Sequence, residues 1–86
     1  MAYAVQIARP GLRQLRRLAG DIQSRLRPHI GALSEDPRPP GSRKLVGQND
    51  YRIRVGDYRV VYEVDDASAL VTVTAVLHRR DAYRPR

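Results

Sequence analysis

The sequence contains no cysteine among its 86 residues. This absence excludes disulfides and metal sites built on thiolates, and it is in keeping with a reducing compartment. No segment approaches the roughly 20 consecutive apolar residues of a membrane span. The N-terminal stretch MAYAVQIARPGLRQ also lacks the apolar run of a signal peptide. We therefore predict a cytoplasmic protein that does not enter a membrane.

Lysine is almost absent too, because Lys44 is the only one and every other strongly basic residue is arginine. Sixteen basic side chains face nine acidic ones, which gives a formal net charge of +7. The guanidinium fork grips phosphate oxygens with two parallel hydrogen bonds and stays charged when partly buried. RNA, DNA or an acidic protein are therefore the leading partners. A G+C-rich genome is an alternative reason for the preference for arginine, although it does not explain the net charge.

The length favours one domain spanning residues 1–86, with a thin core, because such small chains bury only about 60% of their unfolded surface. Alternating apolar residues and turn residues predict strands. The expected strands are 2–8, a short edge strand at 44–46, and three further strands at 51–55, 58–64 and 69–77. Residues 34–43 are proline-rich and are expected to form a loop.

Two helices are predicted between the first strand and this loop. The first carries Leu12, Leu15, Leu18 and Ala19 at helical spacing and is expected to stop at Gly20. Asp21 is the expected N-cap of the second, whose buried stripe comprises Ile22, Leu26, Ile30 and Leu33. Pro28 predicts a kink or a split near 24–28. The fold class is therefore α+β, in the order β-α-α-β-β-β, with a twisted, mainly antiparallel sheet covered on one face by a helical hairpin.

The segment DYRIRVGDYRVVYEVDD at 50–66 indicates a charged sheet face. A two-residue turn at Gly56-Asp57, of type II′, pairs Arg54 with Arg59 and Arg52 with Val61. Strand alternation then places the three arginines on the face opposite the helices. Like charges on neighbouring strands repel, so the pattern favours a phosphate-binding platform. The alternative is a solvated polar face on which Glu63 and Asp81 pair some of the charge.

The tail supplies further candidates directly after the last strand: His78, Arg79, Arg80 and Tyr83. Arginine stabilises charge that develops on a phosphoryl group, histidine can transfer protons, and tyrosine can stack on a base. The alternative is a frayed basic tail. His29 lies in the helical hairpin and is interpreted as structural.

The chain also resembles a known protein family. The start MAYAVQIARPGLRQLRRL, the Lys44-Leu45 pair, the GDYRVVYEVDD hairpin and the HRRDAYR end together resemble the RelE branch of the RelE/ParE toxin superfamily. The resemblance covers nearly the whole chain. It implies the toxin of a type II toxin–antitoxin pair, held by a cognate antitoxin. It also implies a ribosome-dependent endoribonuclease that cleaves translated mRNA through attack by the 2′-hydroxyl, with no metal and no cofactor.

The resemblance also implies roles for individual residues. Arg52, Arg54 and Arg59 would hold the phosphate, Arg79 would assist the leaving group or the transition state, and Tyr83 would orient the RNA. Lys44 and Arg80 are additional RNA-binding candidates. Better-known members of the family have lysine at one or both of the positions of Arg52 and Arg54. Arginine does not readily lose its proton, so His78 becomes the candidate acid or base.

Two alternative functions remain open on the sequence. One is a ParE-like inhibitor of DNA gyrase without nuclease activity, a branch that generally lacks the full set of arginines and the C-terminal tyrosine. The other is a non-catalytic nucleic-acid-binding domain that uses the same basic face, with salt-sensitive binding and no product.

Overall fold

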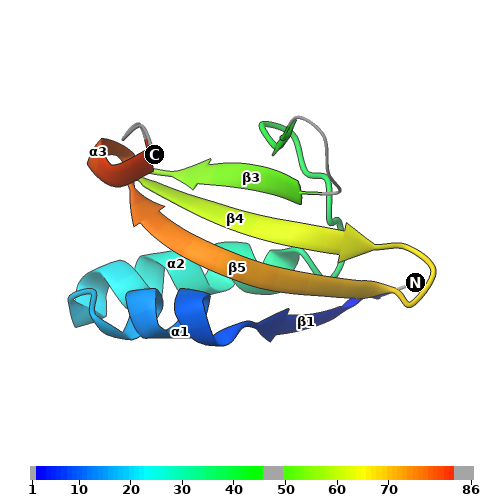
Figure 1. Cartoon of the computed structure of the whole chain (residues 1–86), viewed down its shortest axis with the longest axis horizontal. Helices are drawn as coiled ribbons and strands as arrows, with labels where there is room; N and C mark the ends of the chain where they lie inside the picture. Colours follow the sequence, from blue (N-terminus) through cyan, green and yellow to red (C-terminus); the bar gives the residue numbers. More distant parts are fainter. Residues whose placement is uncertain (1, 46–49, 83–86) are drawn as a thin grey trace.

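The computed structural model describes residues 2–45 and 50–82 of the chain (Figure 1). Its elements are β1 (Ala4–Ile7), α1 (Arg9–Arg16), α2 (Gly20–Ala32), β2 (Arg43–Lys44), β3 (Asp50–Val55), β4 (Tyr58–Asp65), β5 (Leu70–His78) and α3 (Arg79–Ala82). Helices α1 and α2 lie on one face of the sheet, and α3 lies at the end of β5 (Figure 1). This arrangement confirms the predicted α+β class. The predicted order β-α-α-β-β-β is correct up to the helices, but four strands follow them rather than three, and α3 ends the described chain. No helix within the described ranges is long and apolar enough to cross a membrane.

The sheet has five strands in the order β1-β5-β4-β3-β2. Strand β1 pairs with β5 in parallel, and the other pairs are antiparallel, so the sheet is mainly antiparallel as expected. Strand β2 covers only part of β3, because its two residues pair with Arg52 and Tyr51. The predicted edge strand at 44–46 therefore begins one residue earlier, and Val46 lies outside the described residues.

The helices begin and end at different residues from those predicted. Helix α1 starts at Arg9 rather than Leu12, because Pro10 occupies its first turn, where the missing N–H costs nothing. Gly20 does not stop α1; it is the first residue of α2, and Ala19 takes the N-cap position without a side-chain cap. The prediction of Asp21 as N-cap was wrong. Asp21 instead lies inside the first turn, where its negative charge interacts favourably with the positive end of the helix dipole.

Proline does not divide the second helix. Helix α2 runs without interruption from Gly20 to Ala32 with Pro28 inside it, so the predicted split was wrong. The proline ring removes a hydrogen bond to the carbonyl of Ser24. Both Ser24 and Pro28 lie on the exposed face of the helix, so water can hydrate that carbonyl. The opposite face buries Leu26 and Ile30 as predicted.

A β-bulge in β5 sets which of its residues face the helices. Val61 pairs with Ala75 and Tyr62 pairs with Val73, so Thr74 is the extra residue. Helix α1 packs directly on this bulge, since a Cβ atom on Gly11 would lie 3.2 Å from the carbonyl carbon of Thr74. Val76 N–H donates to Oε1 of Gln14 over 2.7 Å. The helix therefore supplies an acceptor beside the position where the bulge interrupts the ladder.

The core lies between the helices and the inner face of the sheet. Its buried residues share this face or the facing helix stripe: Leu15, Leu26, Ile30, Leu33, Ile53, Val55, Val60, Tyr62, Val64, Val71, Val73 and Val76. The hydroxyl of Tyr62 donates to the carbonyl of Pro37 over 2.7 Å, which ties the proline-rich loop to the sheet. Burial raises the pKa of Tyr62 to about 12.

A polar network joins this loop to the β4–β5 turn, at the far end of the sheet from α3. Arg38 donates to both carboxylate oxygens of Asp66, at 3.2 and 2.8 Å, and its Nε donates to the hydroxyl of Tyr51. The guanidinium also lies 5.0 Å from the centre of the Tyr51 ring. Tyr3 donates to Asp66 over 2.6 Å. The hydrogen bonds from Arg38, and then that from Tyr3, lower the pKa of Asp66.

Asp66→Asn should therefore remove a pH-dependent part of the stability. The folded-state pKa of Asp66 is depressed, so its stabilisation is fully present above the unfolded value of about 3.9 and is lost as pH falls through the folded value. We expect the difference in free energy of unfolding between wild type and Asp66→Asn to be constant above about pH 5 and to shrink below about pH 4. Urea denaturation followed by circular dichroism across this range measures it.

The control is Asp21→Asn, which makes the same change of charge at a carboxylate outside the ion pairs of the described residues, so its difference from wild type should vary less with pH. A wild-type minus Asp66→Asn difference that stayed flat down to pH 2 would show that Arg38 does not stabilise the charged carboxylate.

Candidate functional site

The β3–β4 hairpin has the register that the sequence predicts. Arg54 lies directly opposite Arg59, and Arg52 lies opposite Val61. The turn has φ +58° at Gly56 and no positive φ at Asp57, which is the pattern of a type II′ turn. Val60 is fully buried against the helices, so its neighbours Arg59 and Val61 face the other way. The three arginines therefore share the face of the sheet that α1 and α2 do not cover.

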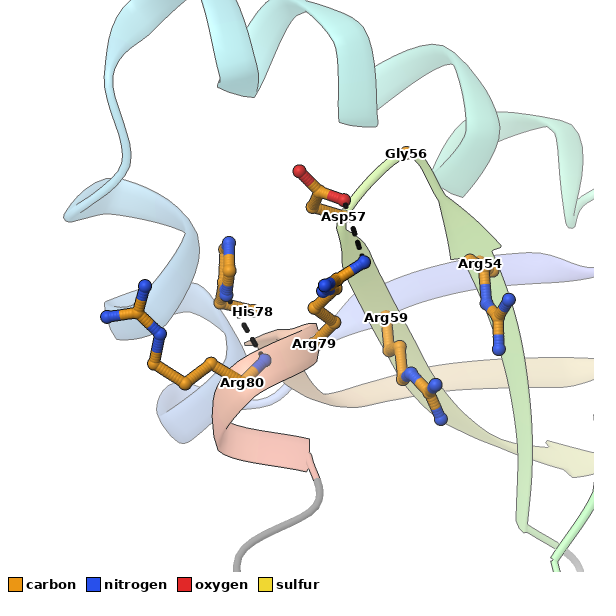
Figure 2. A pocket seen from close by; sticks show the side chains of 7 residues that line it. All are labelled: Arg54, Gly56, Asp57, Arg59, His78, Arg79 and Arg80. Carbon is orange, nitrogen blue, oxygen red and sulfur yellow. Dashed lines mark hydrogen bonds and ion pairs between the residues drawn. The ribbon is translucent and has the colours of Figure 1, made fainter.

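The arginines on this face differ in their exposure. Arg54 is exposed and Arg52 is half-buried, whereas Arg59 is only 4% exposed. Figure 2 shows the side chains of Arg54 and Arg59 running in the same direction from neighbouring strands. Two guanidinium groups held side by side, one of them shielded from water, create a positive field that solvent screens less than at an open surface.

Helix α3 brings the first tail residue to the same place. Arg79 N–H donates to the carbonyl of Asp57 over 2.6 Å, and its guanidinium lies 3.9 Å from the carboxylate of the same residue (Figure 2). The start of α3 is thereby attached to the hairpin turn. Of the predicted group of Arg52, Arg54, Arg59 and Arg79, the last three line one cavity, whereas Arg52 does not.

This cavity, the hairpin pocket, has a volume of about 720 Å³ and is lined by Arg54, Gly56, Asp57, Arg59, His78, Arg79 and Arg80 (Figure 2). Four of these residues are arginines and one is acidic, so the lining is strongly positive. The ion pairs in the described part of the chain join Arg38 to Asp66 and Arg79 to Asp57, which leaves Arg52 and Arg54 without a carboxylate partner there.

His78 is not on the arginine face. It pairs with Tyr58, while Leu77 pairs with Arg59, so the imidazole lies on the side of the sheet that faces the helices. Its ring meets that of Tyr58 edge-on, with centroids 5.2 Å apart. Nδ1 accepts a hydrogen bond from the backbone N–H of Arg80 over 3.2 Å, as an N-cap does. His78 thus reaches the rim of the hairpin pocket from the side, and its ring nitrogen holds the start of α3.

The bulge explains why His78 does not lie on the face that strict strand alternation predicts. Strict alternation from Val71 and Val73 would turn Ala75 and Leu77 inward and His78 outward. The extra residue Thr74 reverses this order, so Val76 and His78 point to the helices instead. A single sequence carries no clear signal for such a bulge, because Thr74 is an ordinary strand residue.

The remaining candidates are dispersed. Lys44 pairs with Tyr51 and therefore points to the opposite face from Arg43, which pairs with Arg52. Arg80 is exposed at the rim of the hairpin pocket. Tyr83 lies outside the described residues, and the side chain of Asp81 is likewise not described. Arg43 is a basic residue on the arginine face that sequence reasoning missed, although extending the edge strand by one residue would have revealed it.

The geometry suits the binding of a phosphodiester rather than proton transfer. Guanidinium groups from β3, β4 and α3 surround one cavity, and none of them readily gives up a proton. In the described ranges no group of three or more His, Asp or Glu side chains could hold a metal ion. The chemistry that these residues can supply is therefore the stabilisation of negative charge on a bound phosphate.

Comparison with known proteins gives a consistent result. Residues 5–83 match the family described as the ParE toxin of type II toxin-antitoxin system, parDE. The chain is 33% identical to Toxin RelG of Mycobacterium tuberculosis, over 98% of this chain and 99% of that protein. It superposes on the toxin-antitoxin complex RelBE2 from Mycobacterium tuberculosis with a TM-score of 0.81 and 27% identity, over 92% of this chain and 93% of that chain. For the archaeal RelE-RelB complex from Pyrococcus horikoshii the TM-score is 0.81 and the identity is 28%, with coverage of 92% of this chain and 97% of that chain.

The buried guanidinium of Arg59 gives a prediction about stability. Methionine keeps most of the apolar volume of the arginine stem, so Arg59→Met should lower the free energy of unfolding less than Arg59→Ala does. Arg59→Ala leaves a cavity at a site that is 4% exposed and should cost about 2–5 kcal/mol. Guanidinium chloride denaturation of the two variants measures the difference. If methionine proved as destabilising as alanine, the fold itself would depend on the charge at this position.

Proposed function

The chain belongs to the ParE toxin family of type II toxin-antitoxin systems and is a RelE-like toxin, and from this premise we propose that it is a ribosome-dependent endoribonuclease acting on translated mRNA. The observation that carries the proposal is the gathering of Arg54, Arg59 and Arg79 around the hairpin pocket. A sheet selected only for stability would not place Arg54 opposite Arg59. A bound RNA backbone offsets their repulsion.

In the proposed reaction the RNA supplies its own nucleophile. The 2′-hydroxyl oxygen forms a bond to the adjacent phosphorus, the bond from phosphorus to the 5′-oxygen breaks, and a 2′,3′-cyclic phosphate and a 5′-hydroxyl result. Negative charge grows on the non-bridging oxygens and on the leaving oxygen. Arg54 and Arg59 would donate to the former, and Arg79, which comes from α3, would serve the latter.

Proton transfer is assigned to no side chain of this protein. Arginine, with a pKa above about 12, is a poor base, and His78 faces the helices while its Nδ1 holds the start of α3. The 2′-hydroxyl proton would pass to solvent or to a nucleic-acid group, and the 5′-oxygen would be protonated from solvent. Catalysis would then rest on charge stabilisation and on the ribosome, which holds the mRNA strand in line for attack.

The proposed partners follow from the net charge of the chain and from the similar solved structures. Two of the similar structures are complexes of a toxin with its antitoxin, so we expect a cognate antitoxin encoded beside this chain. An acidic antitoxin segment would neutralise a surface with net charge +7 and cover the hairpin pocket. The ribosome and its mRNA, both polyanions in the cytoplasm, are the proposed targets of the free toxin.

Inhibition of DNA gyrase is the second candidate function. It is favoured by the family match itself, which is described as a ParE toxin. It does not account for the arrangement of three arginines around one cavity, since a protein–protein inhibitor has no need of a phosphate site. A supercoiling assay with purified gyrase separates it from RNA cleavage.

Removing the pocket charges should abolish cleavage without unfolding the protein. Arg59→Met and Arg54→Ala should each lower the rate of cleavage of ribosome-bound mRNA by about 10²–10³-fold, the usual cost of losing one donor to a developing oxyanion. Primer extension in a reconstituted translation system measures the rate. Induction of the same variants in a bacterial host should no longer arrest growth.

Arg27→Ala is the matched control, because it removes one exposed arginine from α2, away from the hairpin pocket. Full toxicity of a variant that carries both Arg54→Ala and Arg59→Met would show that this pocket is not the active site. Toxicity with intact mRNA and inhibited supercoiling would instead support inhibition of DNA gyrase as the function.

His78→Asn should leave catalysis almost unchanged. Asparagine can accept the hydrogen bond from the N–H of Arg80 and keep the start of α3 in place. We expect a cleavage rate within about threefold of wild type and the same profile between about pH 6 and 8. A loss of about 100-fold together with a changed pH profile would assign proton transfer to His78 after all.

A further inference from the structure

A second cavity, the edge pocket, lies on the other side of Arg54 from the hairpin pocket. It has a volume of about 470 Å³ and is lined by residues that include His29, Pro39, Pro40, Arg43, Arg52 and Arg54. These come from four places in the chain: the end of α2, the proline-rich loop, β2 and β3. Among these residues, the proposed reaction uses Arg54 alone.

The pocket exists because β2 is short. Strand β2 begins only at Arg43, opposite Arg52, whereas β3 continues beyond Arg52 to Val55. Leu45 N–H donates to the carbonyl of Asp50, so the backbone groups of even-numbered β3 residues point to the β2 side. By this alternation the N–H and C=O of Arg54 point to an edge that β2 no longer covers. The pocket thus combines a backbone donor with charged side chains.

The chemistry of the lining fits a nucleotide. Arg43, Arg52 and Arg54 supply guanidinium groups, and none of the described residues that line the pocket carries a carboxylate. Pro39 and Pro40 add an apolar wall, and the buried side chains of Leu33 and Ile53 lie behind it. A phosphate would meet the arginines while the flat face of a base packs on the apolar wall. The volume lies within the usual range of small-ligand sites, about 300–1,000 Å³.

Continuity with the hairpin pocket identifies which nucleotide this is. Arg54 lines both cavities, so one RNA strand can pass over it from the first to the second. We propose that the edge pocket is a subsite for the nucleotide next to the scissile phosphate, bound by Arg43 and His29. This inference rests on the proposed function, since it assumes that RNA occupies the hairpin pocket. It would make residues of α2 and β2 contribute to the choice of cleavage sequence.

An acidic peptide is the competing occupant. RNA is favoured because the positive lining is continuous with the hairpin pocket and because the edge pocket combines phosphate-binding forks with a wall suited to a flat ring. An acidic peptide strand added to the edge of β3 would pair with the backbone groups of Arg54 and place its carboxylates against Arg43 and His29. Removing these two side chains would then weaken the binding of the peptide and leave the binding of RNA unchanged.

The test compares Arg43→Ala and His29→Ala with Arg27→Ala, all at exposed positions. The probe is a fluorescein-labelled RNA hexamer with a 2′-O-methyl group at every nucleotide, which cannot be cleaved. Fluorescence anisotropy gives its dissociation constant at several salt concentrations. We expect both pocket variants to bind about tenfold more weakly. Arg43→Ala should also reduce the slope of log K against log salt by about 0.7, the value for one lost single-strand phosphate contact.

Cleavage of ribosome-bound mRNA provides the second readout. Arg43→Ala and His29→Ala should raise KM about tenfold with kcat within about threefold, because they remove binding without touching the reacting phosphate. Arg27→Ala should change neither constant. Wild-type behaviour of both pocket variants, with Arg59→Met inactive, overturns the subsite and leaves the proposed function standing.

Two further outcomes also decide the question. Loss of antitoxin binding in Arg43→Ala and His29→Ala, with RNA binding intact, overturns the subsite in favour of a peptide. An active Arg59→Met variant would contradict the proposed function itself, and with it the premise of the subsite.

Discussion

The two-residue turn at Gly56-Asp57 is the constraint on which the rest of the structure depends. Gly56 adopts φ +58°, and the turn places Arg54 opposite Arg59 without any choice of register. A slip by one residue would bring the arginines to the apolar face and Val60 to water, so the hydrophobic pattern enforces the same register. Opposed like charges cost about 0.2–1 kcal/mol, a modest penalty that the apolar contacts on the other face outweigh.

The bulge at Thr74 is the second constraint, because it changes which residues of β5 point to each face of the sheet. It brings Val76 into the core and allows Gly11 of α1 to approach the backbone of β5. It also turns His78 toward the helices, where Nδ1 accepts the N–H of Arg80. One extra residue therefore removes the only histidine of the tail from the arginine face and makes it hold the start of α3.

Period-two patterning and turn chemistry sufficed to predict the strands, the hairpin register and the shared face of the arginines, because these depend on neighbours in the sequence. The remaining features depend on contacts between distant residues. The parallel pairing of β1 with β5 and the bulge against Gly11 leave no local signature. The split predicted at Pro28 was wrong because the exposure of Ser24, which makes the proline tolerable, depends on how α2 packs on the sheet. The edge pocket depends on where β2 stops, and helix and strand ends are the least predictable features of a sequence.

The distribution of carboxylates argues that the excess charge at the hairpin is a property of the site and not of the composition. At the far end of the sheet, Arg38 is held by both oxygens of Asp66 and lies against Tyr51, so an arginine there is matched within the fold. Around the hairpin pocket the described lining offers four arginines and one aspartate, which already faces Arg79. The fold thus pairs Arg38 and Arg79 with carboxylates, whereas Arg54 faces the hairpin pocket without a carboxylate partner among the described residues. A partner that supplies negative charge, whether an RNA backbone or an acidic protein segment, would complement Arg54.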